Sequence, residues 1–320
     1  MKGVFLDLDT VDRGDLDLAR LRSVLPEWDF HLHTRPGDIA ARIADAAVVV
    51  TNKVVLDADS LAGAAPLKLI CAAATGTNNI DIRAAALRDI PVCNARDYAT
   101  DSVVQHVFAL LLTLVTRLDA YRADIRAGRW SESEQFCLLD HPIRTLAGMH
   151  LGIVGRGVLG QATGRLAEAF GMRVTFARSL RPDATDSKDR PALDDLLPEL
   201  DALSLHCPLT EATRNLVNRS RLARMRGGGL LINTARGGLV DPNALADSLR
   251  SGHLGGAGID VLEPEPPPAD HPLLAADVPN LVLTPHTAWA ARRARQNVLD
   301  EVAANIAAFL EGNPRNVVRT

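Results

Sequence analysis

The sequence has little that would suit a membrane-spanning, secreted or nucleic-acid-binding protein. Its longest apolar run, Val107–Leu112, is far shorter than the roughly 20 residues that cross a bilayer. Lys and Arg total 35 against 39 for Asp and Glu, so the net charge of −4 leaves no basic excess for nucleic acid. The four cysteines show no metal-type spacing, which is typical of a reduced cytoplasmic chain. We therefore expect a cytoplasmic protein without membrane, nucleic-acid or metal partners.

The 320 residues alternate short apolar runs with amphipathic segments, a rhythm that predicts two α/β domains with parallel sheets. Two long helices are expected, over about Asp101–Ala127 and over Ala290–Glu311. Eleven strands are predicted, and the last six form the unbroken series that a doubly wound dinucleotide domain requires. These strands are Gly3–Leu8, Asp29–His33, Ala46–Thr51, Leu67–Ala74, Pro91–Asn94, His150–Val154, Arg173–Ala177, Ala202–His206, Leu230–Asn233, Ala257–Val261 and Asn280–Leu283.

A glycine motif of the GxGxxG type follows the first strand of the second series. It lies directly before a helix-like segment, which is the context that lets a backbone turn and a helix N-terminus hold a pyrophosphate. The alternative is a glycine-rich turn without a ligand. The motif consists of Gly155, Arg156, Gly157, Val158, Leu159 and Gly160.

The end of the next strand bears on the choice of cofactor. An NAD site usually has an acidic residue about 20 residues after the motif, to accept the ribose hydroxyls. Here the strand ends in Arg178, Ser179 and Arg181, which would suit a 2′-phosphate. We therefore predict NADP, with NAD as the alternative if these arginines are only solvated and Asp183 serves the ribose.

Three residues at successive strand ends have the chemistry that reduction of a ketone needs. Arg236 follows the fourth strand of the second series, Glu265 the fifth and His286 the sixth. A cation can orient the substrate, a histidine can donate the proton, and a carboxylate can keep that histidine protonated. The carboxyl ends of parallel strands are also where such sheets bind ligands. Each residue alone is commonplace, but the three together predict a dehydrogenase site.

With the segments around them, these residues give the chain a resemblance to a known family. It resembles the D-isomer-specific 2-hydroxyacid dehydrogenases over essentially its whole length, and within them the glycerate dehydrogenase and hydroxypyruvate reductase group. The segments that carry the resemblance are ATGTNNID (74–81), YATDSVVQHVFALLL (98–112), FCLLDHPI (136–143), the glycine motif, NTARGGLVD (233–241), DVLEPEPP (260–267) and TPHTAW (284–289).

The resemblance implies a cofactor domain, residues 102–288, inserted into a split flavodoxin-like substrate domain, residues 1–101 and 289–320. It implies that His286 is the general acid and base and that Glu265 hydrogen-bonds its other ring nitrogen and favours the imidazolium. Arg236 would bind the substrate carboxylate and carbonyl. The expected reaction converts hydroxypyruvate or glyoxylate to D-glycerate or glycolate. Further cofactor-binding residues are expected at Cys207, Pro208, Thr234, Ala235 and Asp260.

On the substrate side, the resemblance implies that backbone amides of Thr75, Gly76 and Thr77 bind the substrate carboxylate. Lys53 is a candidate second cation, or a solvated lysine. Trp289 either closes the pocket or anchors the final helix to the core.

A homodimer is also expected, because Trp130 and Phe136 fall in a segment that packs against a second subunit in relatives. Three alternatives remain: a dehydrogenase for a larger keto acid, a formate dehydrogenase, and a dinucleotide-sensing scaffold of the corepressor type. Glu265 argues against formate dehydrogenase, which typically lacks this partner, and a scaffold would show little turnover.

Overall fold

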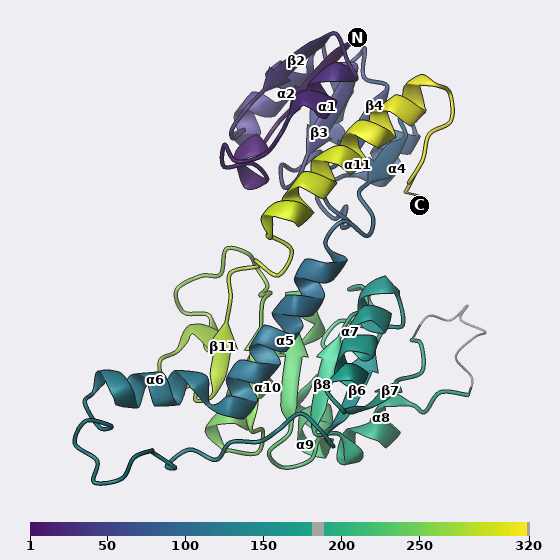
Figure 1. The fold of residues 1–320 in the computed structure, drawn as a ribbon. Coiled ribbons are helices and arrows are strands. Elements are labelled where there is room, and N and C mark those ends of the chain that lie inside the picture. Colours follow the sequence, from purple (N-terminus) through teal and green to yellow (C-terminus); the bar gives the residue numbers. More distant parts are fainter. Residues whose placement is uncertain (181–188, 319–320) are drawn as a thin grey trace. The chain divides into compact units, whose positions relative to one another are not determined.

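A computed structural model describes residues 1–180 and 189–318, which form two compact units. Unit 1 comprises Met1–Ala99 and Trp289–Thr320, and unit 2 comprises Thr100–Ala288 (Figure 1). The strands of unit 1 are β1 (Lys2–Phe5), β2 (Glu27–Phe30), β3 (Val48–Thr51), β4 (Leu69–Ala72) and β5 (Val92–Asn94). Its helices are η1 (Leu8–Thr10), α1 (Ala19–Ser23), η2 (Pro36–Asp38), α2 (Ile39–Ile43), α3 (Ala58–Ala62), α4 (Ile82–Ala86) and α11 (Arg292–Leu310).

Unit 2 contains the second series of strands. They are β6 (His150–Val154), β7 (Arg173–Phe176), β8 (Ala202–Leu205), β9 (Leu230–Asn233), β10 (Gly256–Ile259) and β11 (Leu281–Leu283). Its helices are α5 (Thr100–Thr116), α6 (Leu118–Arg126), α7 (Val158–Ala169), α8 (Leu193–Leu196), η4 (Leu197–Glu199), α9 (Arg219–Arg224), η5 (Gly237–Leu239), α10 (Pro242–Arg250) and η6 (Pro272–Leu274).

Both sheets are parallel and covered by helices on both faces, which confirms the predicted fold class. Unit 1 has the order β2-β1-β3-β4-β5, the flavodoxin-like arrangement. Its strands β3 and β4 are wholly buried, as expected of a sheet that has no solvent face. Helix α11 packs on one face of this sheet, and α2, α3 and α4 pack on the other.

The sheet of unit 2 has the order β7-β6-β8-β9-β10-β11. In the commonest dinucleotide fold the third strand lies outside the second, whereas here β8 returns directly to the other side of β6. The strand order therefore reverses at β6, and the loops that follow β6 and β8 meet at this switch point. Ligands of open parallel sheets bind at such a position.

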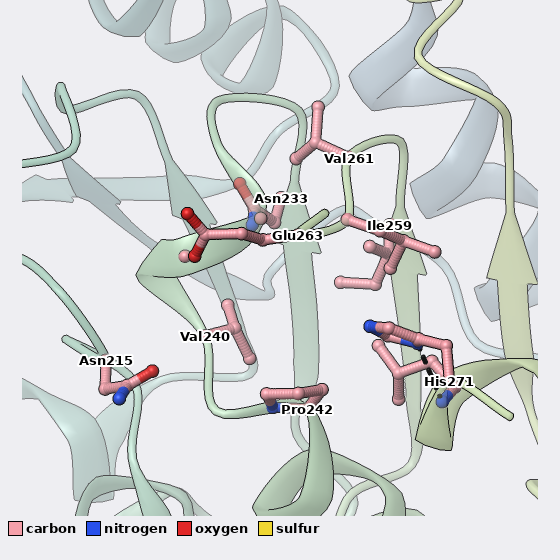
Figure 2. A pocket seen from close by; sticks show the side chains of 12 residues that line it. Asn215, Asn233, Val240, Pro242, Ile259, Val261, Glu263 and His271 are labelled. Atoms are coloured by element: carbon pink, nitrogen blue, oxygen red, sulfur yellow. Dashed lines mark hydrogen bonds between the residues drawn. The ribbon is translucent and has the colours of Figure 1, made fainter. Parts of the chain in front are cut away.

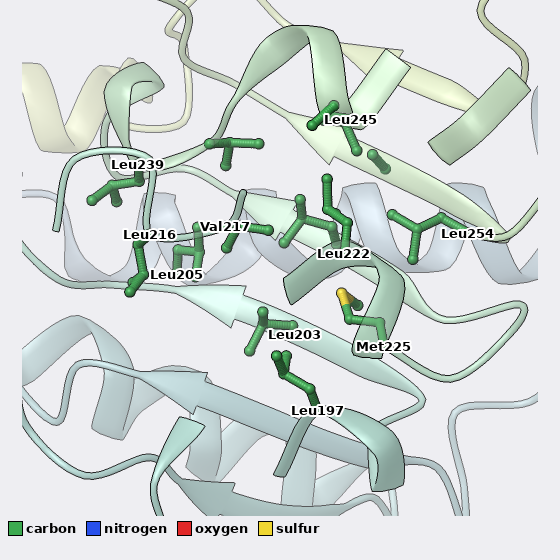
Figure 3. Packing of buried hydrophobic residues seen from close by; sticks show 14 of the residues in the cluster. Leu197, Leu203, Leu205, Leu216, Val217, Leu222, Met225, Leu239, Leu245 and Leu254 are labelled. Atoms are coloured by element: carbon green, nitrogen blue, oxygen red, sulfur yellow. The ribbon is translucent and has the colours of Figure 1, made fainter. Parts of the chain in front are cut away.

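Two helix layers hold the unit 2 sheet. Helices α9 and α10 cover one face, where Leu203 of β8, Leu222 and Leu245 point into one cluster (Figure 3). Helices α5 and α7 cover the other face. Helix α5 approaches β10 very closely, since a Cβ added to Gly258 would lie only 2.7 Å from Cβ of Leu110. Glycine at this strand position therefore lets the helix rest directly on the backbone.

The predicted single helix over Asp101–Ala127 is wrong, because it is broken at Arg117. This residue has a left-handed φ of 54°, which ends α5, and α6 continues at an angle of 59°. The break coincides with the end of the buried apolar run at Val115, after which α6 is mostly exposed and polar. Among the described residues no single helix is long and apolar enough to cross a membrane, although this bent pair passes that test by length and composition.

Candidate active site

His286 and Glu265 form a close pair in unit 2. The Nδ1 atom of His286 lies 2.6 Å from Oε2 of Glu265, and the two side chains are 28% and 34% exposed. His286 has a left-handed φ of 54°, which for a residue other than glycine requires support from its surroundings. With Nδ1 held by a carboxylate, the imidazole ring is fixed in one orientation, with Nε2 left for a substrate.

The loop that carries Glu265 is fastened at two points. The other carboxylate oxygen of Glu265 accepts a 2.9 Å hydrogen bond from the backbone N–H of Leu262. Two residues earlier, Glu263 forms a two-pronged ion pair with Arg214, at 2.7 and 3.3 Å. This pair is about half exposed, so it contributes little free energy but restricts the loop.

Arg236 begins the turn after β9, next to the Glu265 loop. Its backbone carbonyl accepts a 2.8 Å hydrogen bond from Asn233 Nδ2, and its guanidinium donates to the carbonyl of Ala235 at 2.6 Å. A Cβ on Gly237 would collide with the backbone of Leu262, so the two turns touch. The three predicted catalytic residues therefore come after the carboxyl ends of three neighbouring strands: Arg236 after β9, Glu265 after β10 and His286 after β11.

Asp260 supports the turn that carries His286, a role that the sequence analysis did not foresee. Asp260 is only 1% exposed, and its carboxylate accepts hydrogen bonds from the Thr284 hydroxyl (2.5 Å) and from the backbone N–H groups of Thr287 and Ala288 (both 2.9 Å). Its backbone carbonyl accepts from the N–H of His286 at 2.7 Å. Asp260 follows directly after an apolar strand, and this context was the one sequence signal of a buried structural carboxylate.

The glycine motif has the shape that a dinucleotide requires. Gly155 has a φ of +102°, and an added Cβ would collide with the carbonyl of His206, so the loops after β6 and β8 are in contact. Gly157 faces open space and caps α7 without a side chain, so the helix N-terminus offers its amides to an anion. The buried hydroxyl of Thr234 has no hydrogen-bond partner among the described residues. These features fit a bound dinucleotide.

The remaining cofactor candidates lie in the same region of unit 2. The guanidinium of Arg156 stacks over the ring of Phe176, 5.7 Å from its centroid. Burial raises the pKa of the Cys207 thiol to about 11, so this thiol is unreactive. Pro208 follows it and accepts a hydrogen bond from Thr213. The motif residues Val158 and Leu159 begin α7, and Gly160 packs against the Gly155 carbonyl.

Arg178 and Ser179 follow β7, the strand beside β6. The Nε atom of Arg178 donates to the carbonyl of Arg190 at 3.1 Å, which holds the guanidinium near this corner of the sheet. The other two residues weighed for cofactor choice, Arg181 and Asp183, lie outside the described residues.

A small cavity of about 60 Å³ adjoins the turns of Arg236 and Glu265. Figure 2 shows Asn233, Val240, Ile259, Glu263 and His271 around it. Pockets that hold a cofactor measure roughly 300–1,000 Å³, so this one has room only for water-sized molecules. It therefore belongs to the packing behind the turns.

Lys53 lies in unit 1, where Asp7 holds the loop after β3. The Asp7 carboxylate accepts hydrogen bonds from the backbone N–H groups of Asn52 (2.9 Å), Lys53 (2.6 Å) and Val54 (3.1 Å). Burial raises the pKa of Asp7, although these three hydrogen bonds favour its charged form. Lys53 lines a cavity of about 600 Å³ formed by residues that follow β1, β2 and β3.

The other substrate-side candidates are also in unit 1. Thr75 is tied back by its hydroxyl, which donates to the Ala95 carbonyl at 2.9 Å, while Gly76 and Thr77 are partly exposed. None of the three lines the cavity beside Lys53. Trp289 packs against the unit 1 core and meets Tyr98 edge to face at 6.3 Å, which favours the anchoring alternative.

The sequence of this chain matches a described protein family. The profile of the D-isomer specific 2-hydroxyacid dehydrogenase, NAD binding domain, matches residues 108–288. The chain therefore belongs to the D-isomer-specific 2-hydroxyacid dehydrogenases, a family of nicotinamide-dependent oxidoreductases, as the sequence analysis predicted.

Particular relatives are similar over the full length. The glycerate dehydrogenase of Methylorubrum extorquens is 42% identical over 318 residues, covering 99% of this chain and 98% of the relative. The hydroxypyruvate reductase of Blautia hydrogenotrophica is 35% identical over 322 residues, covering 99% of each. The crystal structure of the TT0316 protein from Thermus thermophilus superposes with a TM-score of 0.86 at 36% identity, covering 100% of both chains.

Proposed function

We propose that this enzyme reduces a small 2-keto acid, hydroxypyruvate or glyoxylate, to the D-2-hydroxy acid. The names of the full-length relatives support this substrate class. Bound reduced nicotinamide would supply a hydride to the carbonyl carbon. His286 would give its Nε2 proton to the carbonyl oxygen, and Glu265 would hold Nδ1 and stabilise the cation. Arg236 would place positive charge beside the substrate carboxylate and the developing alkoxide.

The observation that carries this proposal is the 2.6 Å contact between His286 and Glu265 at the edge where Arg236 also lies. A carboxylate at Nδ1 assists a ring that must donate a proton, whereas hydride transfer from formate requires no proton donor. The test is the loss of nicotinamide absorbance with hydroxypyruvate, glyoxylate and pyruvate. Turnover with either of the first two supports the proposal. Turnover with pyruvate alone would contradict the proposed substrate, and no turnover with any of the three would favour a larger keto acid or the scaffold alternative.

We further propose NADPH as the preferred cofactor. Arg178 and Ser179 supply a guanidinium and a hydroxyl at the end of β7, where a carboxylate would repel the 2′-phosphate. Four further residues would complete the cofactor groove around the glycine motif: Cys207, Pro208, Thr234 and Ala235.

The cofactor proposal is tested by kcat/KM with NADPH and with NADH. We expect Arg178→Gln to lower the value for NADPH by about tenfold or more and to change that for NADH little, since one charge-assisted bond is lost. Arg165→Gln, which removes an exposed arginine of α7, is the matched control. A wild-type preference for NADH would leave the enzyme class intact and refute the cofactor assignment.

We also propose a homodimer formed through the segment after α6. Phe136 is 91% exposed, Leu139 78% and Trp130 52%, and such a group of apolar side chains is costly in water. Sedimentation of the wild type and of Phe136→Asp would test this, with a dimer weakened by the variant as the expected result. The split into a substrate domain and a cofactor domain, and the cytoplasmic location, stay predictions.

A further inference from the structure

One face of helix α5 is continuous from the sheet to the turn that carries His286. Ser102, His106, Leu110 and Leu114 are spaced four residues apart, so they share a face of the helix. At the apolar end of this face, Leu110 and Leu114 rest on Gly258 and Gly256 of β10. The polar end lies beside the residues that follow β10 and β11.

The polar end of this face holds the His286 turn by two hydrogen bonds. The Ser102 hydroxyl donates to the carbonyl of Ala288 at 2.6 Å. The Nε2 atom of His106 lies 2.8 Å from the Thr284 hydroxyl oxygen, and that hydroxyl donates its single proton to Asp260 at 2.5 Å. His106 Nε2 must therefore be the donor to Thr284.

The contacts form a chain from helix to turn: His106 to Thr284, Thr284 to Asp260, and Asp260 to the backbone of residues 286–288. The side chain of His106 is 20% exposed and that of Asp260 is 0% exposed, so water competes little for these bonds. The left-handed backbone of His286 needs such support, because it persists only where its surroundings fix it.

We infer that His106 is a positioning residue for His286, acting through Thr284 and Asp260 as a hydrogen-bond donor. This rests on the proposed role of His286 in proton transfer. Without the Nε2 donor, the Thr284 hydroxyl can rotate away from Asp260, and the turn loses one of the bonds that fix the imidazole. Proton transfer depends on that orientation, whereas binding of the dinucleotide at the glycine motif does not.

The test compares His106→Leu with His106→Gln. Glutamine can place an amide N–H near the position of Nε2, and leucine cannot. We expect His106→Leu to lower kcat by about tenfold or more with the dissociation constant of the reduced cofactor unchanged, and His106→Gln to recover most of the loss. Unchanged kcat in His106→Leu, or an equal loss in both variants, would overturn the inference.

A second pair tests the route through Thr284. Thr284→Val should behave like His106→Leu, and Thr284→Ser, which keeps the hydroxyl, like the wild type. The double variant His106→Leu/Thr284→Val should lose no more than either single variant, because both break one chain. Losses that multiply would contradict that route. If His106→Leu does not fold, the valine and serine variants carry the same test.

Amide hydrogen exchange separates this inference from the proposed reaction. His106→Leu and Thr284→Val should speed exchange at residues 286–288 by about tenfold, and His106→Gln and Thr284→Ser should not. If the wild type turns over no keto acid yet shows this exchange pattern, the reaction is wrong and the support of the turn stands. If turnover is found but the exchange is alike in all variants, the support by His106 is wrong.

Discussion

Two histidines of unit 2 follow parallel strands of the same sheet, His206 directly after β8 and His286 after β11. His286 is partly exposed and has a carboxylate 2.6 Å from Nδ1. The Nε2 atom of His206 instead lies 2.8 Å from the Ser204 hydroxyl, and burial lowers the pKa of His206 to about 4. One ring has a carboxylate as its partner, and the other has a neutral hydroxyl and surroundings that disfavour its charged form.

The difference shows that position after a strand does not by itself set the chemical surroundings of a histidine. What differs is the groups around the ring. His286 has a carboxylate on an adjacent loop and a turn held by hydrogen bonds, whereas His206 has a neutral hydroxyl as its partner. Substitutions of the two histidines and of the groups around them test this contrast, and they follow in order of the expected loss of activity or stability.

The largest effect is expected from His286→Gln. Loss of the proton donor should lower kcat about 10³-fold, or roughly 4 kcal/mol, because general acid catalysis contributes about 10²–10⁴-fold. Steady-state kinetics with the preferred keto acid measures this. Cofactor binding, followed by fluorescence of the bound dinucleotide, should be retained and serves as the control. A loss below tenfold would contradict the assigned role.

The next largest effect concerns stability. Asp260→Ala leaves two backbone N–H groups and the Thr284 hydroxyl without their acceptor in a buried site, so we expect the free energy of unfolding to fall by about 3 kcal/mol. Urea denaturation measures it. Asp277→Ala is the control, since this carboxylate pairs with Arg250 at the surface and should matter by less than about 1 kcal/mol. Similar losses in the two variants would mean that the buried hydrogen bonds of Asp260 contribute little to the free energy of unfolding.

Much of the fold and part of the site could be predicted from the sequence. The period of apolar residues predicted the eleven strands, and the spacing of Gly155, Gly157 and Gly160 predicted the dinucleotide turn, because both depend on local pattern. The break at Arg117 could not be predicted, since the helical pattern continues through it and only the end of burial explains it. The roles of Asp260 and His106 depend on contacts between residues far apart in the chain, which the spacing of residues in the sequence does not predict.

A smaller effect is expected from Glu265→Gln. The amide can still accept the hydrogen bond from Leu262 and contact Nδ1 of His286, but it no longer stabilises the imidazolium. We expect kcat to fall about tenfold, or roughly 1.4 kcal/mol. Glu263→Gln, which only weakens the exposed pair with Arg214, should change kcat by less than about threefold. Equal losses would indicate that loop order matters more than the charge.

The smallest effect on the reaction is expected at His206, where stability should respond to pH. Its pKa is about 4 in the folded chain against an ordinary value of 6.5, so between these values the unfolded chain binds more protons. Stability therefore falls as pH drops from about 6.5 to 4. His206→Gln can keep a bond to Ser204 without titrating, so the urea midpoint should fall less over this range while kcat changes less than about tenfold. A variant as pH-sensitive as the wild type would show that other groups set the slope. A kcat loss comparable to that of His286→Gln would mean that the two histidines are not as different as their surroundings indicate.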